Sequence, residues 1–389
     1  MRLTKLFNDF FESEKGGVLL IVCTVISLLL ANSSLGESYL NLWHFKFAGL
    51  STENWINEGL MAIFFFLIGL ELKREIFVGE LSNAKNAMLP VFAAVGGMII
   101  PAAIFAFFNY GTATQSGAGI PMATDIAFAI GILSLLGTRV PASLKILLTA
   151  IAVIDDLGAI LVIAVFYTTS LSLLNLLIVL VIFGILLLFN YLKINFLILY
   201  IIGGIVMWYF MLHSGVHSTL AGILLAFAIP FGKGEKASLS YKLQDWLHKP
   251  VALIILPLFA LANTAIVFGG GWDTGLAEPG SLGIFAGLIV GKPLGVFLFS
   301  FLAVSSGVCA LPLGLKWKQV LGIGFLAGIG FTMSIFITLL AYSDMVMITE
   351  SKISILLASL VSGITGYTWL HILLKKTQTI PLRKAKSIY

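Results

Sequence analysis

Ionisable residues inside otherwise apolar stretches are the first candidates for chemistry in this sequence. They are Asp125, Asp155, Asp156, His217 and Lys292. At the centre of a bilayer a charged side chain costs at least ~2.5–3.5 kcal/mol, so such groups need partners or a water-filled cavity. One aspartate and one lysine would make a structural ion pair. Three aspartates against one lysine leave surplus negative charge, which predicts a site for protons or a cation.

Asp155 and Asp156 are adjacent, so on a helix their side chains diverge by about 100°. One carboxylate can then meet Lys292 while the other opens onto an ion pathway. Close acids titrate as a coupled set. Carboxylate oxygens suit a hard cation such as Na⁺, and the chain has no thiol or imidazole cluster for a transition metal. The pair therefore predicts a site where Na⁺ and protons compete.

The elements that position these residues must lie in lipid. Of the 389 residues, 59% are hydrophobic and only 11% are charged, far less charge than a soluble domain needs. Apolar runs of about 20 residues match the hydrocarbon core. We expect an all-α integral membrane protein forming a single transmembrane domain over residues 1–389. The net charge of +5 is scattered over short connections, which argues against nucleic-acid binding.

Hydropathy and helix breakers predict about twelve transmembrane helices. A signal peptide is the alternative for the first, but Glu12 and Glu14 spoil its basic region. The predicted spans are 14–31, 56–78, 88–109, 118–136, 143–167, 172–192, 195–211, 215–229, 249–268, 281–304, 319–342 and 350–374.

The distribution of basic residues predicts orientation. Almost all of the 23 Lys and Arg residues lie in alternate connections, whereas the opposite connections hold only Lys46 and Lys352. The positive-inside rule then places both termini in the cytoplasm. We expect a multi-pass protein of the inner (plasma) membrane, with the lipid bilayer as its main partner.

Between the first two spans, residues 39–49 read YLNLWHFKFAG, with partial period-two alternation. This pattern indicates an external β-hairpin, although a plain loop fits equally well. An isolated hairpin is only marginally stable, so it favours contact with a second subunit. We therefore expect a homodimer formed through residues 39–49.

Two predicted spans are interrupted. Residues 116–131 (SGAGIPMATDIAFAIG) and 327–334 (AGIGFTMS) place Gly and Pro inside apolar stretches. Interrupted spans in the two halves of a transporter point to inverted repeats, with discontinuous helices crossing near mid-membrane. Asp125 would offset the positive helix ends there, and Lys292 the negative ones. The alternative is that these glycines serve only tight packing.

A further glycine row leads to Lys292. Gly283, Gly287, Gly291 and Gly295 are spaced by four and share one helix face, which permits close approach of a neighbouring helix. Pro293 follows the lysine and kinks its helix. We expect Lys292 to be held against the broken helices.

Several segments together resemble the NhaA sodium/proton antiporters. They are TDIAFAIG (124–131), AIAVIDDLGAI (150–160), LHSGVHSTLAG (212–222), GKPLG (291–295) and GIGFTMSIFI (328–337). The likeness extends from Phe10 to about Leu374. It implies that the fourth and eleventh of twelve helices are unwound. It also implies Asp156 as the principal Na⁺ ligand with Asp155 and Thr124 nearby, Lys292 paired with Asp155, and Asp125 balancing the helix ends.

The resemblance also implies electrogenic exchange and activation at alkaline pH. The matching pH-sensing positions would be Glu71, Arg74, Glu75, Lys242 and Asp245. The sequence departs from the family here, because Asp245 replaces a longer Glu and Lys249 stands where a His is common. His217 fits the family's histidine near the eighth helix, where a hydrogen-bonded structural role is the alternative to pH sensing.

The predicted activity is Na⁺/H⁺ antiport, with Li⁺ as a second transported ion, serving sodium and pH homeostasis. It is a transporter without a cofactor, not an enzyme. Either Lys292 or Asp155 could carry the second proton. The alternatives are a sodium-coupled symporter on the same scaffold and an intramembrane aspartyl protease. A symporter needs a polar cavity for an organic substrate, and a protease needs one Asp on each of two facing helices.

Overall fold

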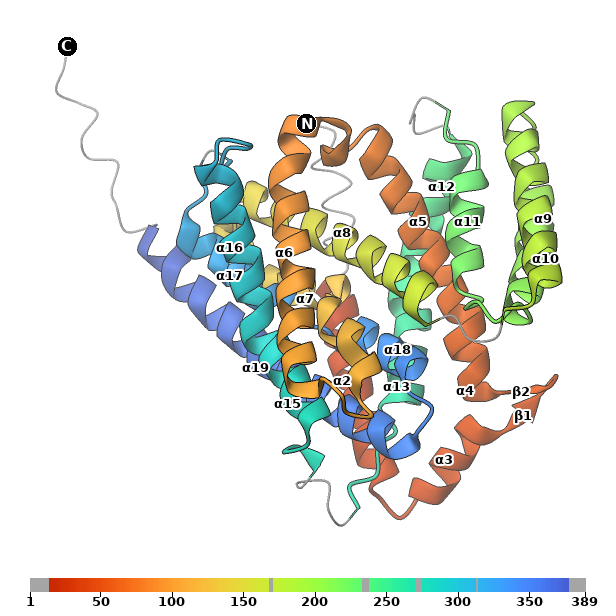
Figure 1. Cartoon of the computed structure of the whole chain (residues 1–389), viewed down its shortest axis with the longest axis horizontal. Helices are drawn as coiled ribbons and strands as arrows, with labels where there is room; N and C mark the ends of the chain where they lie inside the picture. The colour runs from red at the N-terminus through yellow and green to blue at the C-terminus, as the bar shows by residue number, and fades with distance from the viewer. Residues whose placement is uncertain (1–13, 168–170, 233–237, 270–274, 313, 378–389) are drawn as a thin grey trace.

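The computed structural model describes residues 14–167, 171–232, 238–269, 275–312 and 314–377, which are mostly helical (Figure 1). Both chain termini, whose side of the membrane was predicted, lie outside these residues. The α-helices are α2 (Glu14–Ala31), α3 (Gly36–His44), α4 (Thr52–Asn54), α5 (Met61–Phe77), α6 (Ala84–Asn109), α7 (Ile126–Ser134), α8 (Ala142–Phe166), α9 (Leu173–Tyr191), α10 (Leu197–Leu212), α11 (Leu220–Ala228), α12 (Leu239–Pro250), α13 (Leu256–Asn263), α15 (Pro279–Ala286), α16 (Lys292–Ser305), α17 (Trp317–Ala327), α18 (Phe331–Ala341) and α19 (Met345–Thr377).

Shorter elements join these helices. A 3₁₀-helix, η3 (Gln115–Met122), precedes α7, and three π-helical turns continue neighbouring α-helices. The turns are η1 (Trp55–Leu60), η5 (Val251–Ile255) and η6 (Gly287–Gly291). Two short strands, β1 (Lys46–Phe47) and β2 (Leu50–Ser51), pair antiparallel, Lys46 opposite Ser51. Departures from α-helical geometry thus occur at residues 55–60, 115–125, 251–255, 287–291 and 328–330.

Many of the helices have the length and apolar composition of membrane-spanning helices. Within the described ranges, eight helical stretches are long and apolar enough to cross a membrane, or up to ten if two bent pairs are each one span. The bent pairs are α2 with α3, at 114°, and α17 with α18, at 48°. Helices α9 and α10 expose rows of large apolar side chains, including Leu173, Leu174 and Ile205. Such apolar surface needs a membrane or partner to cover it.

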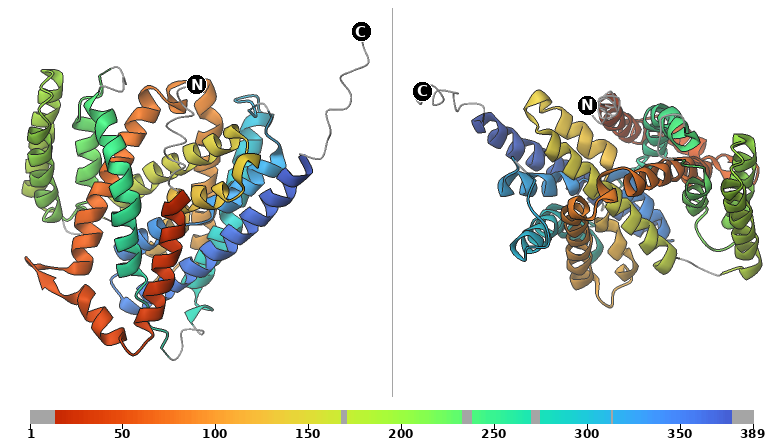
Figure 2. Two further views of the ribbon diagram at one scale, coloured as in Figure 1. Left: turned by 180° about the vertical axis from the view of Figure 1, so that it is seen from behind. Right: turned by 90° about the horizontal axis from the view of Figure 1, so that it is seen from above.

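Helix α9 and helix α10 lie side by side at one edge, and α11 with α5 connects them to the main bundle (Figure 1). The views from behind and from above also show α9 and α10 at one edge, apart from the main bundle (Figure 2). Helix α8 runs obliquely through the bundle between α6 and the broken helices. The candidate site residues of α8 therefore lie inside the molecule.

All twelve predicted spans contain helix, but their boundaries differ and their number as membrane crossings stays a prediction. The predicted span 249–268 belongs to a helical stretch that begins at Leu239, contains Pro250 and the π-helical turn η5, and ends at Asn263. The predicted span 215–229 is helical only from Leu220 to Ala228. Gly215 has a positive φ of 83°, so a turn rather than a helix precedes α11.

The predicted hairpin over residues 39–49 is wrong for its first half. Residues 36–44 form α3, because Tyr39 and Trp43 are four residues apart and pack together on one helix face. The Tyr39 hydroxyl donates to Ser27 Oγ at 3.0 Å, which fixes α3 against α2. The hairpin that does form covers residues 46–51. Its turn uses Ala48 and Gly49, both with positive φ.

The glycine row before Lys292 packs against α6. A Cβ added at Gly295 would overlap the carbonyl of Gly96, so α16 and α6 touch backbone to backbone. Helix α8 approaches α6 differently: the atom facing Gly158 is the thioether sulfur of Met98. One contact of α6 is therefore made by backbone and the other by a flexible side chain.

Candidate ion-binding site

Two broken helices meet at the centre of the site. The first is η3 followed by α7, interrupted at residues 123–125, and the second is α17 followed by α18, interrupted at residues 328–330. The Asp125 backbone N–H donates to the Ile329 carbonyl at 2.7 Å. The Thr124 hydroxyl donates to the Ala327 carbonyl at 2.8 Å. The two interruptions thus satisfy part of each other's free backbone groups, as non-helical backbone at membrane depth requires.

Asp125 caps both second half-helices. Its Oδ1 accepts from the Phe128 N–H at 2.9 Å, at the start of α7. Its Oδ2 accepts from the Thr332 N–H at 3.1 Å and from the Thr332 hydroxyl, at the start of α18. A negative charge is favourable at a helix N-terminus, and here one carboxylate serves two of them. The negative charge of Asp125 is therefore already compensated by the N-terminal ends of α7 and α18.

Lys292 lies at the start of α16 and is fully buried. Its Nζ is 2.7 Å from Asp155 Oδ2 and also donates to the Met122 carbonyl at the end of η3. Thr124 Oγ1 lies 2.7 Å from the same carboxylate oxygen, so its single proton is shared between Asp155 Oδ2 and the Ala327 carbonyl. The ammonium thus bridges a carboxylate of α8 and the carboxyl end of a half-helix, where positive charge is favourable.

Asp156 differs from the other two aspartates. It is fully buried, and neither of its side-chain oxygens has a hydrogen-bond partner in the described structure. Asp155 Oδ1 is also buried without a partner. Desolvating an unpaired charge costs several kcal/mol even after relaxation. A proton or a bound cation is therefore needed to neutralise Asp156, and the unpaired oxygens face an environment that already contains the charges of Asp125, Asp155 and Lys292.

No group of three or more His, Cys, Asp or Glu residues in the described part of the chain has the geometry to hold a resident metal ion. The unpartnered buried oxygens of the two α8 aspartates are Asp155 Oδ1 and both side-chain oxygens of Asp156. Such oxygens suit a hard, weakly held cation.

The predicted pH-sensing residues are only partly brought together. Glu71 of α5 lies 3.2 Å from His248 Nε2 of α12, and Arg74 lies 3.3 Å from Glu75. Lys242 and Asp245 lie on the exposed face of α12, away from this group. The buried face instead carries Gln244, which is 3% exposed.

His248 was missed in the sequence because Lys249 was taken as its counterpart. The helical spacing of Leu239, Leu243 and Leu247 in the sequence could have identified it, because position 248 lies next to that apolar face. Residues 240, 243, 244 and 247 are buried, so position 248 continues the inner face and position 249 does not.

His217 lies apart from this cluster. Its Nε2 is 3.1 Å from the Tyr167 carbonyl, just before α11 begins. Lys73 of α5 is close to Glu71 and contacts carbonyls at the other end of α11. His217 and Glu71 are therefore at opposite ends of α11, and the contact of His217 is with backbone.

Buried charges beyond the five predicted ones are also present. Lys73, predicted to lie in a connection, is buried in α5 and donates to the Phe227 and Ile229 carbonyls at 2.7 and 2.6 Å. It satisfies the carboxyl end of α11. Lys352, also predicted in a connection, is buried in α19, 4.0 Å from Glu53. The Ser218 hydroxyl donates to Glu58 Oε2 at 2.5 Å.

The helical bundle has the apolar surface of a membrane protein, and two broken helices meet in it beside buried carboxylates and a buried lysine. This combination defines the class of membrane ion transporters. Residues 8–370 match the family described as Na⁺/H⁺ antiporter 1, and the chain belongs to this family.

Its relatives are similar over nearly their whole length. It is 64% identical to the Na⁺/H⁺ antiporter NhaA of Flavobacterium psychrophilum, over 97% of this chain and 98% of that protein. It is 57% identical to NhaA of Cytophaga hutchinsonii, over 97% of both, and 47% identical to NhaA of Vibrio parahaemolyticus, over 96% and 99%. Among solved structures, the sodium proton antiporter MjNhaP1 from Methanocaldococcus jannaschii aligns with a TM-score of 0.57 at 16% identity, covering 97% of this chain and 99% of that one. This last likeness concerns the fold alone.

Proposed function

We propose that this protein exchanges Na⁺ for H⁺ across a membrane and that Asp155 and Asp156 form the shared site for both ions. The observation that carries the proposal is the pair of unpartnered, buried oxygens of Asp156 next to the Lys292–Asp155 ion pair. A group that needs either a proton or a cation provides competition between them. Membership in the Na⁺/H⁺ antiporter 1 family supports the same activity.

The mechanism is competition at one site with alternating access. Na⁺ binds to Asp156, with Asp155 and Thr124 as further oxygen donors, and displaces protons from the carboxylates. The site then opens to the other side, Na⁺ leaves, and protons bind and permit the return. Electrogenic exchange, transport of Li⁺ and regulation by pH through Glu71, Arg74, Glu75 and His248 belong to this proposal. Sodium and pH homeostasis is the physiological role it assigns.

The two alternative activities have no support. The relatives are named as antiporters, which favours neither a sodium-coupled symporter nor an intramembrane aspartyl protease. A protease would need two aspartates free to act on a peptide. Asp155 is bound by Lys292 and Thr124, and Asp125 by Phe128 and Thr332, so neither is free.

We place the protein in the inner (plasma) membrane with both termini in the cytoplasm, because the basic residues alternate between connections. The end of the bundle that carries β1–β2 then faces outward. Inward proton flow would drive Na⁺ export.

Ion exchange can be measured with everted membrane vesicles and a fluorescent dye that reports the transmembrane pH difference. Adding Na⁺ or Li⁺ after the vesicles are energised should restore dye fluorescence between pH 6.5 and 9, because the cation releases protons from the lumen. Choline chloride at equal concentration should give no response. If Na⁺ and Li⁺ also gave none at any pH in membranes that contain the folded protein, the antiport proposal would be wrong.

We further propose that β1–β2 mediates a homodimer. The hairpin projects from the bundle and carries Phe45 and Phe47, whose exposed fractions are 65% and 68% (Figure 1). Its free strand edges are ready to pair with another chain. The proposal thus moves the predicted contact from residues 39–49 to residues 45–51.

Cross-linking tests the hairpin contact. With Cys23 and Cys309 replaced by alanine, Ala48→Cys should form a covalent dimer with a short bis-maleimide in native membranes. Tyr110→Cys, which is also exposed, is the matched control and should stay monomeric. Equal cross-linking of both variants, or of neither, would contradict a dimer through the hairpin.

A further inference from the structure

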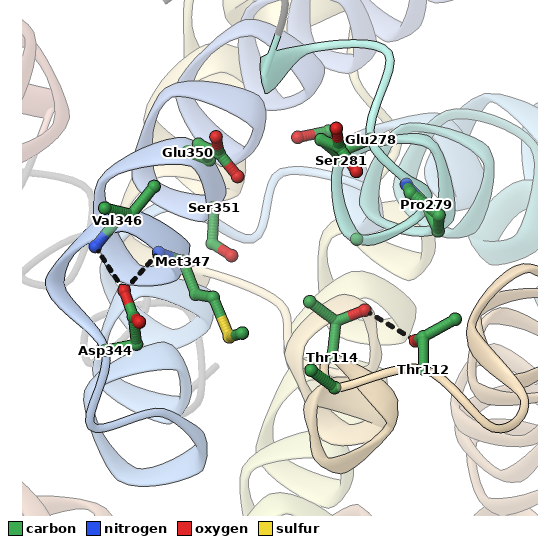
Figure 3. A pocket seen from close by; sticks show the side chains of 12 residues that line it. Thr112, Thr114, Glu278, Pro279, Ser281, Asp344, Val346, Met347, Glu350 and Ser351 are labelled. Carbon is green, nitrogen blue, oxygen red and sulfur yellow. Dashed lines mark hydrogen bonds between the residues drawn. The ribbon is translucent and has the colours of Figure 1, made fainter.

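A second, unassigned site lies at the end of the bundle that carries β1–β2. It is a cavity of about 560 Å³ between the N-terminal ends of α15 and α19 and the loop before η3 (Figure 3). Its lining includes Thr114, Glu278, Ser281, Glu350 and Ser351. None of these residues belongs to the ion-binding site described above, so the function proposed there does not explain the cavity.

The cavity gathers negative charge. Glu278, Asp344 and Glu350 all line it, whereas no Lys or Arg is among the described residues that do so. Glu278, just before α15, and Glu350 of α19 face each other (Figure 3). The carboxylate of Glu350 interacts electrostatically with those of Glu278 and Asp344. Glu278 and Asp344 are exposed, so water screens part of the repulsion among the three carboxylates, and the cavity keeps a negative potential that attracts a cation.

Helix capping explains only one of the three carboxylates. Asp344 Oδ1 accepts from the Val346 N–H at 2.7 Å and so caps α19. Glu278 precedes α15 but makes no side-chain capping bond. The side chains of Glu278 and Glu350 make no hydrogen bond or ion pair with another described residue.

An unpartnered hydroxyl supplies an independent sign of a ligand. Ser351 is only 4% exposed, and its side chain points into the cavity (Figure 3). It makes no side-chain hydrogen bond with a described residue, so its hydroxyl is available to a ligand inside the cavity. The other hydroxyls of the lining are occupied: Ser281 donates to the Gly275 carbonyl at 2.7 Å, and Thr114 donates to Asn109 Oδ1 at 2.6 Å.

The cavity fits a hydrated ion better than a bare one. No three acidic residues in the described ranges have the spacing to coordinate a metal directly. Mg²⁺ gives up its water shell reluctantly and is often held through its waters. Six waters at about 30 Å³ each occupy about 180 Å³, which the cavity can hold. A divalent ion also gains about twice the Coulomb attraction of Na⁺ from the same carboxylates.

We propose that this cavity binds one hydrated Mg²⁺ ion, held through its water shell by Glu278, Asp344 and Glu350, with Ser351 hydrogen-bonded to one of the waters. The bound ion joins α19 to the start of α15, the helical stretch that continues to Lys292. The site is independent of the exchange proposed above, since it shares no residue with it.

Isothermal titration calorimetry of the purified full-length protein with MgCl₂ tests this site, at an ionic strength fixed by choline chloride. The wild type should bind one Mg²⁺ per chain. Glu350→Gln and Ser351→Ala should each weaken binding, by roughly twofold to fivefold, as expected for the loss of one polar contact near the surface. Glu37→Gln removes an exposed carboxylate from α3 and should change nothing.

Three results would overturn the proposal. The wild type could bind no Mg²⁺, or Glu37→Gln could weaken binding as much as Glu350→Gln, which would indicate a diffuse surface field. Asp156→Asn could abolish binding, which would place the ion at the transport site instead. Thermal unfolding of each variant, compared with and without MgCl₂, separates lost binding from lost folding, because a folded protein without the site keeps its transition but loses the Mg²⁺-dependent increase in Tm.

Discussion

Replacing Asp156 by asparagine should abolish Na⁺-dependent proton movement while the protein stays folded in the membrane. Asparagine has nearly the shape of the protonated aspartate, but it carries no negative charge and exchanges no proton at neutral pH. Because neither oxygen of Asp156 has a protein partner, the substitution breaks no hydrogen bond within the described structure. Losing one partner of a buried charge contact costs about 2–5 kcal/mol, so Na⁺ binding should weaken roughly 30-fold or more.

Everted vesicles measure the exchange by this variant, and thermal unfolding in detergent measures its stability. Glu37→Gln is the control, since it also removes one carboxylate but from the exposed face of α3. Exchange at the wild-type rate and Na⁺ affinity in Asp156→Asn would show that the unpartnered carboxylate is not the Na⁺ site.

Replacing Lys292 by methionine should cost stability as well as transport. The methionine fills most of the same space, so the effect reports the lost charge rather than a cavity. Asp155 would keep its bond from Thr124 but lose its 2.7 Å ion pair. Removing one partner of a buried ion pair is expected to cost about 3–5 kcal/mol, because the other charge stays buried without compensation.

The double variant Asp155→Asn with Lys292→Met separates stability from function. With both charges gone, no uncompensated ion remains, and the double variant should recover much of the stability that the single variant loses. Transport should stay absent in both. Thermal unfolding of the wild type, Asp155→Asn, Lys292→Met and the double variant in one detergent gives the coupling free energy. A single Lys292→Met variant as stable as the wild type would show that the pair contributes nothing to folding.

The presence of buried charges at these positions was predictable because its signals are local. An aspartate or lysine inside an apolar run stands out by its cost in lipid, and Gly and Pro inside such a run interrupt a helix wherever it packs. Asp125, Asp155, Asp156 and Lys292 could therefore be selected without a structure. The structure places Thr124 and Lys292 on the same carboxylate oxygen of Asp155.

Partners set by packing were not predictable. Thr332 binds Asp125 from 207 residues away, and no periodicity reports such a contact. Lys73 is expected in a connection because positive charge usually marks the membrane edge. The structure instead places it in the interior, where free carbonyls at the end of α11 accept its hydrogen bonds. Residues 39–44 look like a strand because alternation over a few residues also fits one side of a short helix. Docking of Tyr39 against Ser27 settles the choice for a helix.

The two different contacts of α6 determine which helices can move relative to each other. At Gly96 and Gly295 backbone contacts backbone, and no side chain lies between the helices that could change its shape. Helices α6 and α16 should therefore move as one rigid unit that includes Lys292. At Gly158 the layer between α6 and α8 is the unbranched thioether of Met98, a side chain that reshapes at little cost. Sliding that exposes Asp155 and Asp156 to the opposite side of the membrane would then follow the Met98 surface. Lys292 would then keep its position relative to α6, and the two carboxylates of α8 would move past it.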